Sequence, residues 1–380
     1  MTRINYAEEF ELMRPYRDEE VQPALGRLTG YPAFDVVLSY LFPDRSLSGV
    51  KEMLLNLSSV DAFQTEFMYH AVYAIVKKTS DGLSSSGMEN LNPGEPYLFI
   101  SNHRDIVLDA AILQVLLLDN GHKTSQITFG SNLMTSPLVV DFGKLNRMFT
   151  FYREGSRIQM YRNSLLHSAY IADAILRKRE SVWIAQRNGR TKDGNDLTQS
   201  ALLKMLGGYQ PDSLQALIDL NIVPMAVSYE YEPCDIEKTR EIYLSGRQEY
   251  VKEKDEDLKS VLSGITSPKG RIHFSFGTPL NSFLESLKGE TLNLNGLSEA
   301  AAAGMDRQIH QMFRLFPNNY IACDMLSGKQ NFAANYTTDE YTLFGEYVSR
   351  KTGVVEGDQE ELRKIFLNLY ARPVLNRFPG

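Results

Sequence analysis

The stretch that decides the fold runs from Tyr97 to Asp109 and reads YLFISNHRDIVLD. Its apolar start, Tyr97–Ile100, predicts a buried strand, and a second apolar run, Ile106–Leu118, is long enough for a helix. The polar turn between them would lie at the carboxyl end of a parallel strand, where open α/β sheets bind their ligands. Because a histidine supported by a carboxylate can act as a general base, His103 is the first candidate catalytic residue.

Two aspartates follow His103 at short range. If residues 103–109 were all helical, His103 and Asp109 could not meet, because six residues rotate a side chain well off the starting face. We therefore expect the chain to turn before the helix begins. Asp105 has a second interpretation, as the N-cap of the helix that starts at Ile106.

Beyond this turn, apolar runs typical of strands alternate with runs typical of helices. The expected strands are Tyr97–Ile100, Gln126–Gly130, Phe149–Tyr152, Val182–Ala185, Val223–Tyr229 and Arg271–Phe276, and the expected helices are Ile106–Leu118, Ile158–Arg177, Leu197–Leu206 and Ser213–Leu220. This alternation predicts an α/β fold with a mainly parallel or mixed sheet flanked by helices. Pro224 predicts that its strand lies near a sheet edge.

Helical patterns on both sides predict three regions. Residues 1–85 form a helical N-terminal region, residues 86–290 the α/β domain and residues 291–380 a helical C-terminal region, with the first boundary placed by the turn residues of Ser80–Gly87. The apolar stripe of Phe34–Phe42 is expected to be core, with a lipid-facing surface as the alternative. The basic amphipathic segment Glu360–Arg377 either docks on the protein or lies on an anionic membrane.

Charge and composition exclude several classes of function. The 380-residue chain has a formal net charge of -7, which argues against a nucleic-acid partner, yet residues 141–200 carry 11 Lys and Arg against 6 Asp and Glu. An electropositive island in an acidic protein favours an anionic ligand. The two cysteines, Cys234 and Cys323, show no metal spacing and fit a reducing compartment. Without a signal peptide or a run of about 20 apolar residues, we expect a cytoplasmic protein that at most lies on a membrane.

Two further strand ends carry arginines. Arg153 follows the strand at Phe149 and could bind a phosphate through its planar pair of donors. Arg187, Arg190 and Lys192 follow the strand at Val182, and Gly189 among them allows close approach of the backbone to a ligand. Either loop could instead be a solvated surface turn. Together with His103, they predict deprotonation of a hydroxyl on a phosphorylated substrate.

Four segments now resemble, in order, the blocks that identify the glycerolphosphate acyltransferase superfamily. They are Asn102-His103 with Asp109, Phe149–Arg153, Gln186–Lys192 and Ile222–Ser228, and the resemblance covers about residues 95–280. Two departures stand out. Five residues separate His103 from Asp109 where the family has four, and Asn188 stands where the family usually has glutamate.

The resemblance implies transfer of a fatty acyl group from acyl-CoA or acyl-acyl carrier protein to a hydroxyl of glycerol 3-phosphate or lysophosphatidate in phospholipid synthesis. His103 would take the hydroxyl proton and Asp109 would orient the imidazole. The implied substrate-binding residues are Asn102, Arg104, Asp105, Arg153, Arg187, Gly189, Arg190 and Lys192. No metal and no bound cofactor are expected, and the enzyme would sit peripherally on the inner face of the membrane.

Two alternatives stay open from the sequence. The acceptor could be another lipid, such as an acylated amino acid, because Asn188 changes the third block. The protein could also bind lipid or acyl carrier protein without catalysis.

Overall fold

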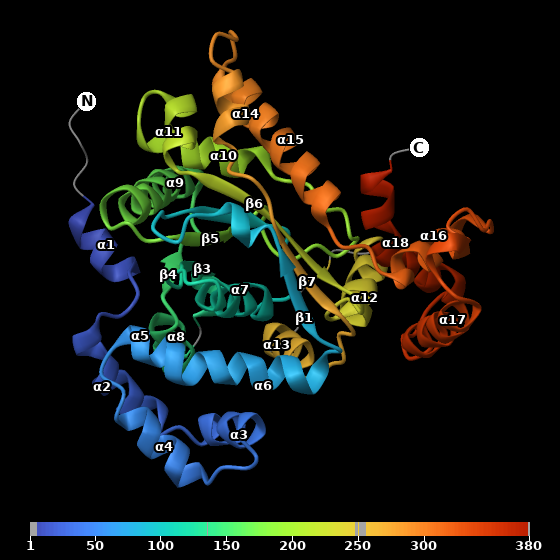
Figure 1. The fold of residues 1–380 in the computed structure, drawn as a ribbon, viewed down its shortest axis with the longest axis horizontal. Coiled ribbons are helices and arrows are strands. Elements are labelled where there is room, and N and C mark those ends of the chain that lie inside the picture. Colours follow the sequence, from blue (N-terminus) through green and yellow to red (C-terminus); the bar gives the residue numbers. More distant parts are fainter. Residues whose placement is uncertain (1–5, 135, 248–249, 251–255, 379–380) are drawn as a thin grey trace.

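A seven-stranded sheet runs through the centre of the protein, for which a computed structural model describes residues 6–134, 136–247, 250 and 256–378 (Figure 1). Its strands are β1 (Leu83–Ser86), β2 (Leu98–Ser101), β3 (Gln126–Gly130), β4 (Met148–Phe151), β5 (Val182–Ala185), β6 (Ile222–Tyr229) and β7 (Ile272–Phe276). They lie in the order β1-β7-β6-β2-β5-β3-β4, and every neighbouring pair is parallel except β6 with β7. The predicted α/β fold with a mixed sheet is confirmed.

Alternate residues of the central strands feed two cores, one on each face of the sheet. Leu98 and Ile100 of β2 point into the first, and Phe99 points into the second. The first face is covered by α9 (Arg157–Ala172), α10 (Ser200–Leu206), α11 (Ser213–Asp219), α14 (Asn281–Ser286) and α15 (Leu294–Met312), and the second by α6 (Tyr69–Thr79), α7 (Leu108–Asp119) and α13 (Glu256–Thr266) (Figure 1). Because both faces are covered, the strands read as apolar runs rather than as alternating ones.

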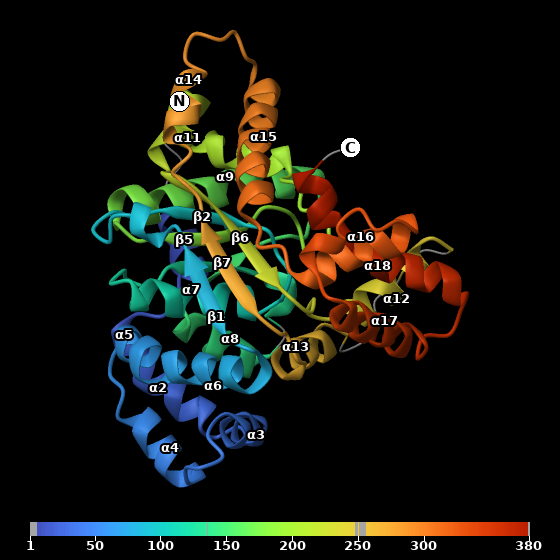
Figure 2. The same ribbon diagram turned by 45° about the vertical axis from the view of Figure 1, so that its right-hand side comes forward.

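The N-terminal segment is helical and packs around a core of its own below the sheet (Figure 2). Its helices are α1 (Ala7–Met13), α2 (Asp18–Leu28), α3 (Pro32–Leu41), α4 (Leu47–Leu55) and α5 (Val60–Ala62), and a π-helical stretch, Phe63–Met68, leads into α6. Phe34 and Leu38 of α3 are buried in this core. Side chains of a helix from the α/β part of the chain, α8 (Pro137–Leu145), also pack into it. The stripe at Phe34–Phe42 is therefore core, although Val36 and Val37 on its other side are exposed.

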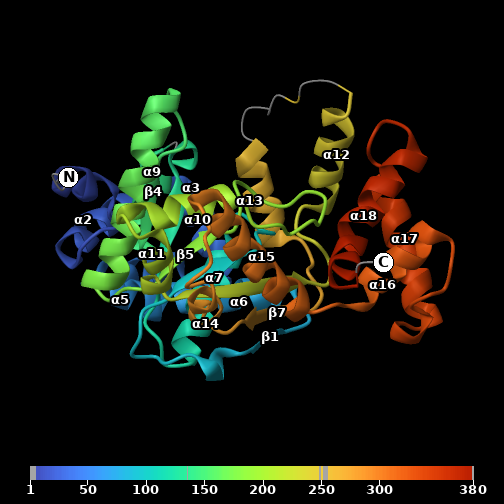
Figure 3. The same ribbon diagram turned by 90° about the horizontal axis from the view of Figure 1, so that it is seen from above.

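The C-terminal segment is also helical and packs beside α12 (Asp235–Ser245), as Figure 3 shows. It contains α16 (Pro317–Ser327), α17 (Thr338–Thr352) and α18 (Gln359–Arg377). Phe366, Tyr370 and Val374 of α18 are buried between these helices, so the segment predicted at Glu360–Arg377 is docked on the protein. In the part of the chain that the structure describes, no helix is both long and apolar enough to cross a bilayer.

The turn predicted at Ser80–Gly87 is in part a strand, which corrects the sequence interpretation. Leu83–Ser86 forms β1, the edge strand that pairs in parallel with β7. Its serines leave no apolar signal because this edge strand is largely exposed, and the hydroxyls of Ser84 and Ser86 instead contact the ring of His273 on β7 at 2.8 and 3.1 Å. Since β1 spans the boundary placed after residue 85, the division into three regions stays a prediction.

The edge position predicted from Pro224 is wrong. Its strand, β6, is buried along its whole length and lies between β7 and β2. The carbonyl oxygen of Pro224 accepts the N–H of Gly277, just beyond the end of β7. The N and O atoms of one strand residue point to the same neighbouring strand. The position of the missing N–H of Pro224 therefore faces the chain just beyond the end of β7, where the ladder of backbone hydrogen bonds has already ended.

Candidate active site

The turn between β2 and α7 brings His103 against Asp109. Nδ1 of the ring lies 2.9 Å from Oδ2 of the carboxylate. Residues 102–107 lie outside any helix and α7 begins at Leu108, so the chain turns before the helix, as expected. The turn accommodates the five intervening residues, and Asp109 rather than Asp105 is the partner of the ring.

Four donors fix the Asp109 carboxylate, which is fully buried. Besides the His103 ring, Oδ2 accepts the backbone N–H groups of Arg104 at 2.6 Å and Asp105 at 3.0 Å, and Oδ1 accepts the Tyr229 hydroxyl at 2.9 Å. Burial and the Asp109 charge raise the pKa of Tyr229 well above its usual value, which keeps the phenol a donor. With Nδ1–H directed at a fixed acceptor, the lone pair of the neutral ring is on Nε2, where a base needs it.

The His103 ring is held in place without being sealed. Its side chain is 14% exposed, and Trp183 of β5 packs against it edge-to-face with ring centroids 5.6 Å apart. The N–H of Thr191, in the loop after β5, donates to the His103 carbonyl oxygen at 2.9 Å. The strand next to β2 thus positions both the backbone and the ring of the candidate base.

Asp105 is the cap of α7 and not a substrate ligand, which corrects the role implied by the resemblance. Oδ1 accepts the N–H groups of Val107 at 2.9 Å and Leu108 at 2.8 Å. Only 1% of the residue is exposed, and a Cβ on Gly264 of α13 would lie 2.1 Å from Oδ2. Burial, followed by the neighbouring charge of Asp109, raises the pKa of Asp105.

Asn102 and Arg104 are also structural, contrary to the substrate contacts implied for them. Asn102 is fully buried and exchanges two hydrogen bonds with the backbone of Val227 on β6, at 2.7 and 3.0 Å. Arg104 is 1% exposed and forms ion pairs with Glu232, at 2.9 Å, and with Asp196. A buried guanidinium requires such paired carboxylates. Their position in the sequence, beside the candidate base His103, did not reveal that these side chains point into the protein.

The ion pairs of Arg104 belong to a buried network that the sequence analysis missed. Nζ of Lys238, on α12, donates to Glu232 at 2.6 Å and to the Arg104 carbonyl oxygen at 2.8 Å. One cation, Lys238, and two carboxylates therefore hold Arg104, the residue after His103. Asp196 and Glu232 follow β5 and β6, the two strands that flank β2, and this placement is the signal that could have identified them.

The two cationic loops meet at the same edge of the sheet. Arg153 follows β4, and its Nη1 donates to Oδ1 of Asn188 in the loop after β5, at 2.9 Å. Arg187 and Arg190, in that same loop, each have a buried nitrogen, Nε and Nη1 respectively, without a hydrogen-bond partner. Among the described residues, none of these three arginines has a carboxylate within 4 Å. Burial lowers the pKa of Arg153 from its usual value, as expected for a guanidinium without a counter-charge.

Lys192 and Gly189 differ in their availability to a ligand. Lys192 forms an ion pair with Glu241 of α12, so the anion-binding role implied for it is not supported by its placement. Gly189 has a φ of +75° and open space where a Cβ would stand, so its backbone is accessible. The structure thus leaves Arg153, Arg187 and Arg190 as the candidate anion ligands.

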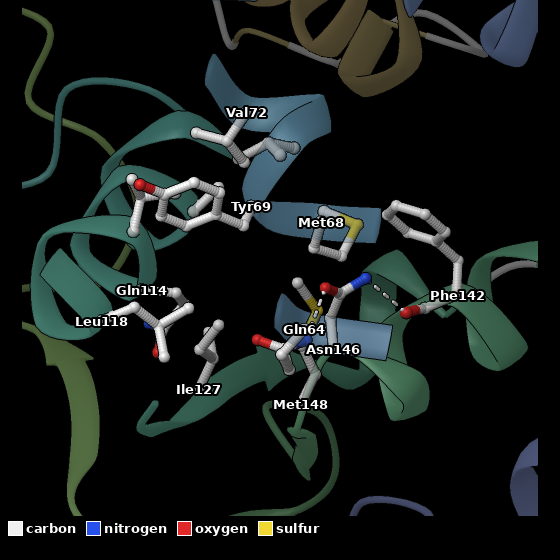
Figure 4. A pocket seen from close by; sticks show the side chains of 13 residues that line it. Gln64, Met68, Tyr69, Val72, Gln114, Leu118, Ile127, Phe142, Asn146 and Met148 are labelled. Carbon is white, nitrogen blue, oxygen red and sulfur yellow. Dashed lines mark hydrogen bonds between the residues drawn. The ribbon is translucent and has the colours of Figure 1, made fainter. Parts of the chain in front are cut away.

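An apolar cavity lies along α7, the helix that follows the His103 turn (Figure 4). Its free volume is small, about 30 Å³, and its lining runs from Val107, just before α7, to Leu118 near the end of the helix. The polar side chains in the lining are already paired: Gln64 donates to Asn146 at 3.0 Å. Ligands in this cavity would therefore meet mainly hydrocarbon.

A match to an acyltransferase domain includes this edge of the sheet. Residues 82–228 match the family model of acyltransferases, a span that runs from the start of β1 into β6 and contains His103, Asp109 and both arginine loops. This match supports the resemblance to the glycerolphosphate acyltransferase superfamily.

Curated proteins and solved structures give two further findings. No curated protein matches the chain significantly. Among solved structures, the chain is similar to the 1-acyl-sn-glycerophosphate (LPA) acyltransferase PlsC from Thermotoga maritima, with 14% sequence identity and a TM-score of 0.38. The similarity covers 77% of this chain and 97% of that chain.

Proposed function

We propose that this acyltransferase moves a fatty acyl group from a thioester to a hydroxyl of glycerol 3-phosphate or lysophosphatidate. The observation that carries the proposal is the pairing of a supported histidine with three arginines that lack a carboxylate partner among the described residues. A carboxylate at position 188 would neutralise Arg153, whereas Asn188 accepts its hydrogen bond and leaves the positive charge available for a phosphate.

In the proposed reaction, Nε2 of His103 takes the proton from the acceptor hydroxyl as its oxygen attacks the thioester carbonyl carbon. The tetrahedral intermediate collapses with breakage of the C–S bond, and the imidazolium returns the proton to the leaving thiolate. Asp109 stabilises the imidazolium and fixes its orientation. A positioned base of this kind contributes about 10²–10⁴-fold to the rate.

The apolar cavity along α7 is the proposed site of the acyl chain, whose entry would move side chains of the lining aside. Its lining spans eleven residues of α7, which corresponds to about 16 Å of helix. Met68 and Met148 contribute flexible, polarisable side chains that adapt to an irregular hydrocarbon surface. A chain lying there would leave its thioester carbonyl at the Val107 end, beside the His103 turn.

The proposed donor is acyl-CoA or acyl-acyl carrier protein, each as a co-substrate. The identity of the acceptor distinguishes this proposal from acylation of another lipid. Thiol release should be followed with both donors and with matched acceptor pairs, glycerol 3-phosphate against glycerol and lysophosphatidate against monoacylglycerol. We expect rapid release only with the phosphorylated member of a pair. Equal rates within each pair, or no thiol release with any acceptor, would contradict the proposal.

A further inference from the structure

The first two turns of α9 stand away from the rest of the protein. Nine consecutive residues, 154–162, are exposed, and the helix begins to be buried only at Asn163. Three of the nine are large apolar side chains, Ile158 at 69%, Met160 at 53% and Tyr161 at 65% exposure. Figure 3 shows α9 reaching beyond the body of the molecule. We name residues 154–162 the α9 tip.

The α9 tip is continuous with the candidate active site. It follows directly after Arg153, whose guanidinium contacts the loop after β5 through Asn188. Arg157 and Arg162 lie within the tip, and among the described residues neither has a carboxylate within 4 Å. Residues 153–162 hold three arginines and one glutamate, Glu154, a local net charge of +2 on a chain whose formal charge is -7.

The distribution of the apolar side chains selects the kind of partner. Ile158 and Tyr161 are three positions apart and share one side of the helix, whereas Met160 lies on another side, so the three do not form a single stripe. A protein groove binds one apolar stripe of a helix. The boundary between lipid headgroups and acyl chains surrounds an inserted helix end, and there the two arginines can extend to anionic headgroups.

We propose that the α9 tip is the segment by which this acyltransferase docks on an anionic bilayer surface, with the apolar side chains inserted and Arg157 and Arg162 at the headgroups. This inference rests on the proposed function in one respect: once the protein is docked, a lipid acceptor would enter the site beside Arg153. Membrane docking itself requires no turnover.

The test is flotation of the full chain with vesicles of phosphatidylcholine alone or of equal phosphatidylcholine and phosphatidylglycerol. We expect the wild type to float with the mixed vesicles and the triple variant Ile158→Ser/Met160→Ser/Tyr161→Ser to bind them about 10-fold or more weakly. Arg157→Gln/Arg162→Gln should reduce the preference for the anionic vesicles, since each arginine near such a surface contributes about fivefold.

The matched control is Leu343→Ser/Val354→Ser, which removes two exposed apolar side chains of the α17 region, at the opposite end of the molecule from α9 (Figures 1 and 3). This control should float like the wild type, and so should His103→Ala, which separates docking from catalysis. Equal binding by the triple variant at an unchanged melting temperature would overturn the inference, and so would equal loss in the control.

Discussion

At the scale of single residues, charge compensation distinguishes substrate ligands from structural groups. Arg104 is buried with two carboxylates and serves the fold, whereas Arg153 and Arg190 have no carboxylate within 4 Å among the described residues. A phosphate is the missing counter-charge in the proposed complex, and hydrogen bonds to charged groups contribute about 1.5–3 kcal/mol each.

Arg153→Ala and Arg190→Ala should therefore each lower kcat/KM for glycerol 3-phosphate by about 10- to 100-fold, mainly through KM. The matched control is Arg179→Ala, which removes an exposed arginine paired with Glu95 just before β5, away from the carboxyl edge. Steady-state kinetics with varied acceptor would check the prediction. A similar loss with unphosphorylated glycerol as the acceptor, or with the control variant, would show that these arginines do not bind the phosphate.

The sequence located the site more reliably than it assigned its residues. Histidine, aspartates and arginines at three strand ends had to lie at one edge, because the carboxyl ends of parallel strands meet there. Which side chains face the ligand depends on the local path of the turn, and for Asn102, Arg104 and Asp105 that path leads into the protein. The roles of His103 and Asp109 stay predictions that their 2.9 Å contact supports.

At the scale of elements, a buried histidine of α9, His167, contacts the end of β4 and is neutral in the folded protein. Nε2 of His167 accepts the N–H of Tyr152 at 3.0 Å, and its ring stacks on Phe151 with centroids 3.8 Å apart. Burial, followed by the charge of Arg153, lowers the pKa of His167 from 6.5 to about 3. Between these two values the unfolded chain binds the extra proton, so this group costs stability as the pH falls below 6.5.

His167→Gln keeps an acceptor for Tyr152 but removes the titration. Between pH 7 and pH 5, the wild type should lose about 2 kcal/mol more of its unfolding free energy than the variant does. Urea unfolding followed by circular dichroism at both pH values measures the difference, with His70→Gln, an exposed change on α6, as the control. The same loss in wild type and His167→Gln would refute the assignment.

Strands with apolar signals were predictable, and β3 and β5 have the predicted bounds. β1 was missed because a short, exposed edge strand is stabilised by backbone pairing with β7 rather than by side-chain burial. The position of β6 was also misjudged, because the effect of Pro224 depends on where its neighbour β7 ends, and no local pattern reports that.

At the scale of the whole molecule, the C-terminal helices support the turn that carries His103. The Tyr370 hydroxyl of α18 donates to Oδ2 of Asp235 at 2.8 Å and accepts the N–H of Glu232 at 3.0 Å. Glu232 in turn pairs with Arg104, the residue after His103. Helices far away in sequence are thus connected to the candidate base through two residues, a link that no sequence pattern indicated.

Tyr370→Phe should lower the unfolding free energy by about 1–3 kcal/mol, because buried polar groups lose their partner, and should also lower kcat several-fold with little change in KM. Tyr347→Phe is the matched control, since its hydroxyl donates to the same carboxylate, that of Asp235, at 2.6 Å. It should lower stability while leaving kcat near the wild-type value. Equal effects of the two variants on kcat would mean that the contact with Glu232 does not position the turn.

The central claim is that His103 is the base of an acyl transfer, and thiol release from acyl-CoA in the presence of glycerol 3-phosphate measures it most directly. His103→Ala removes a partly exposed ring, so the variant should keep its melting temperature while thiol release falls by about 10²–10⁴-fold. Release within a few-fold of the wild-type rate, from a folded variant, would contradict the account.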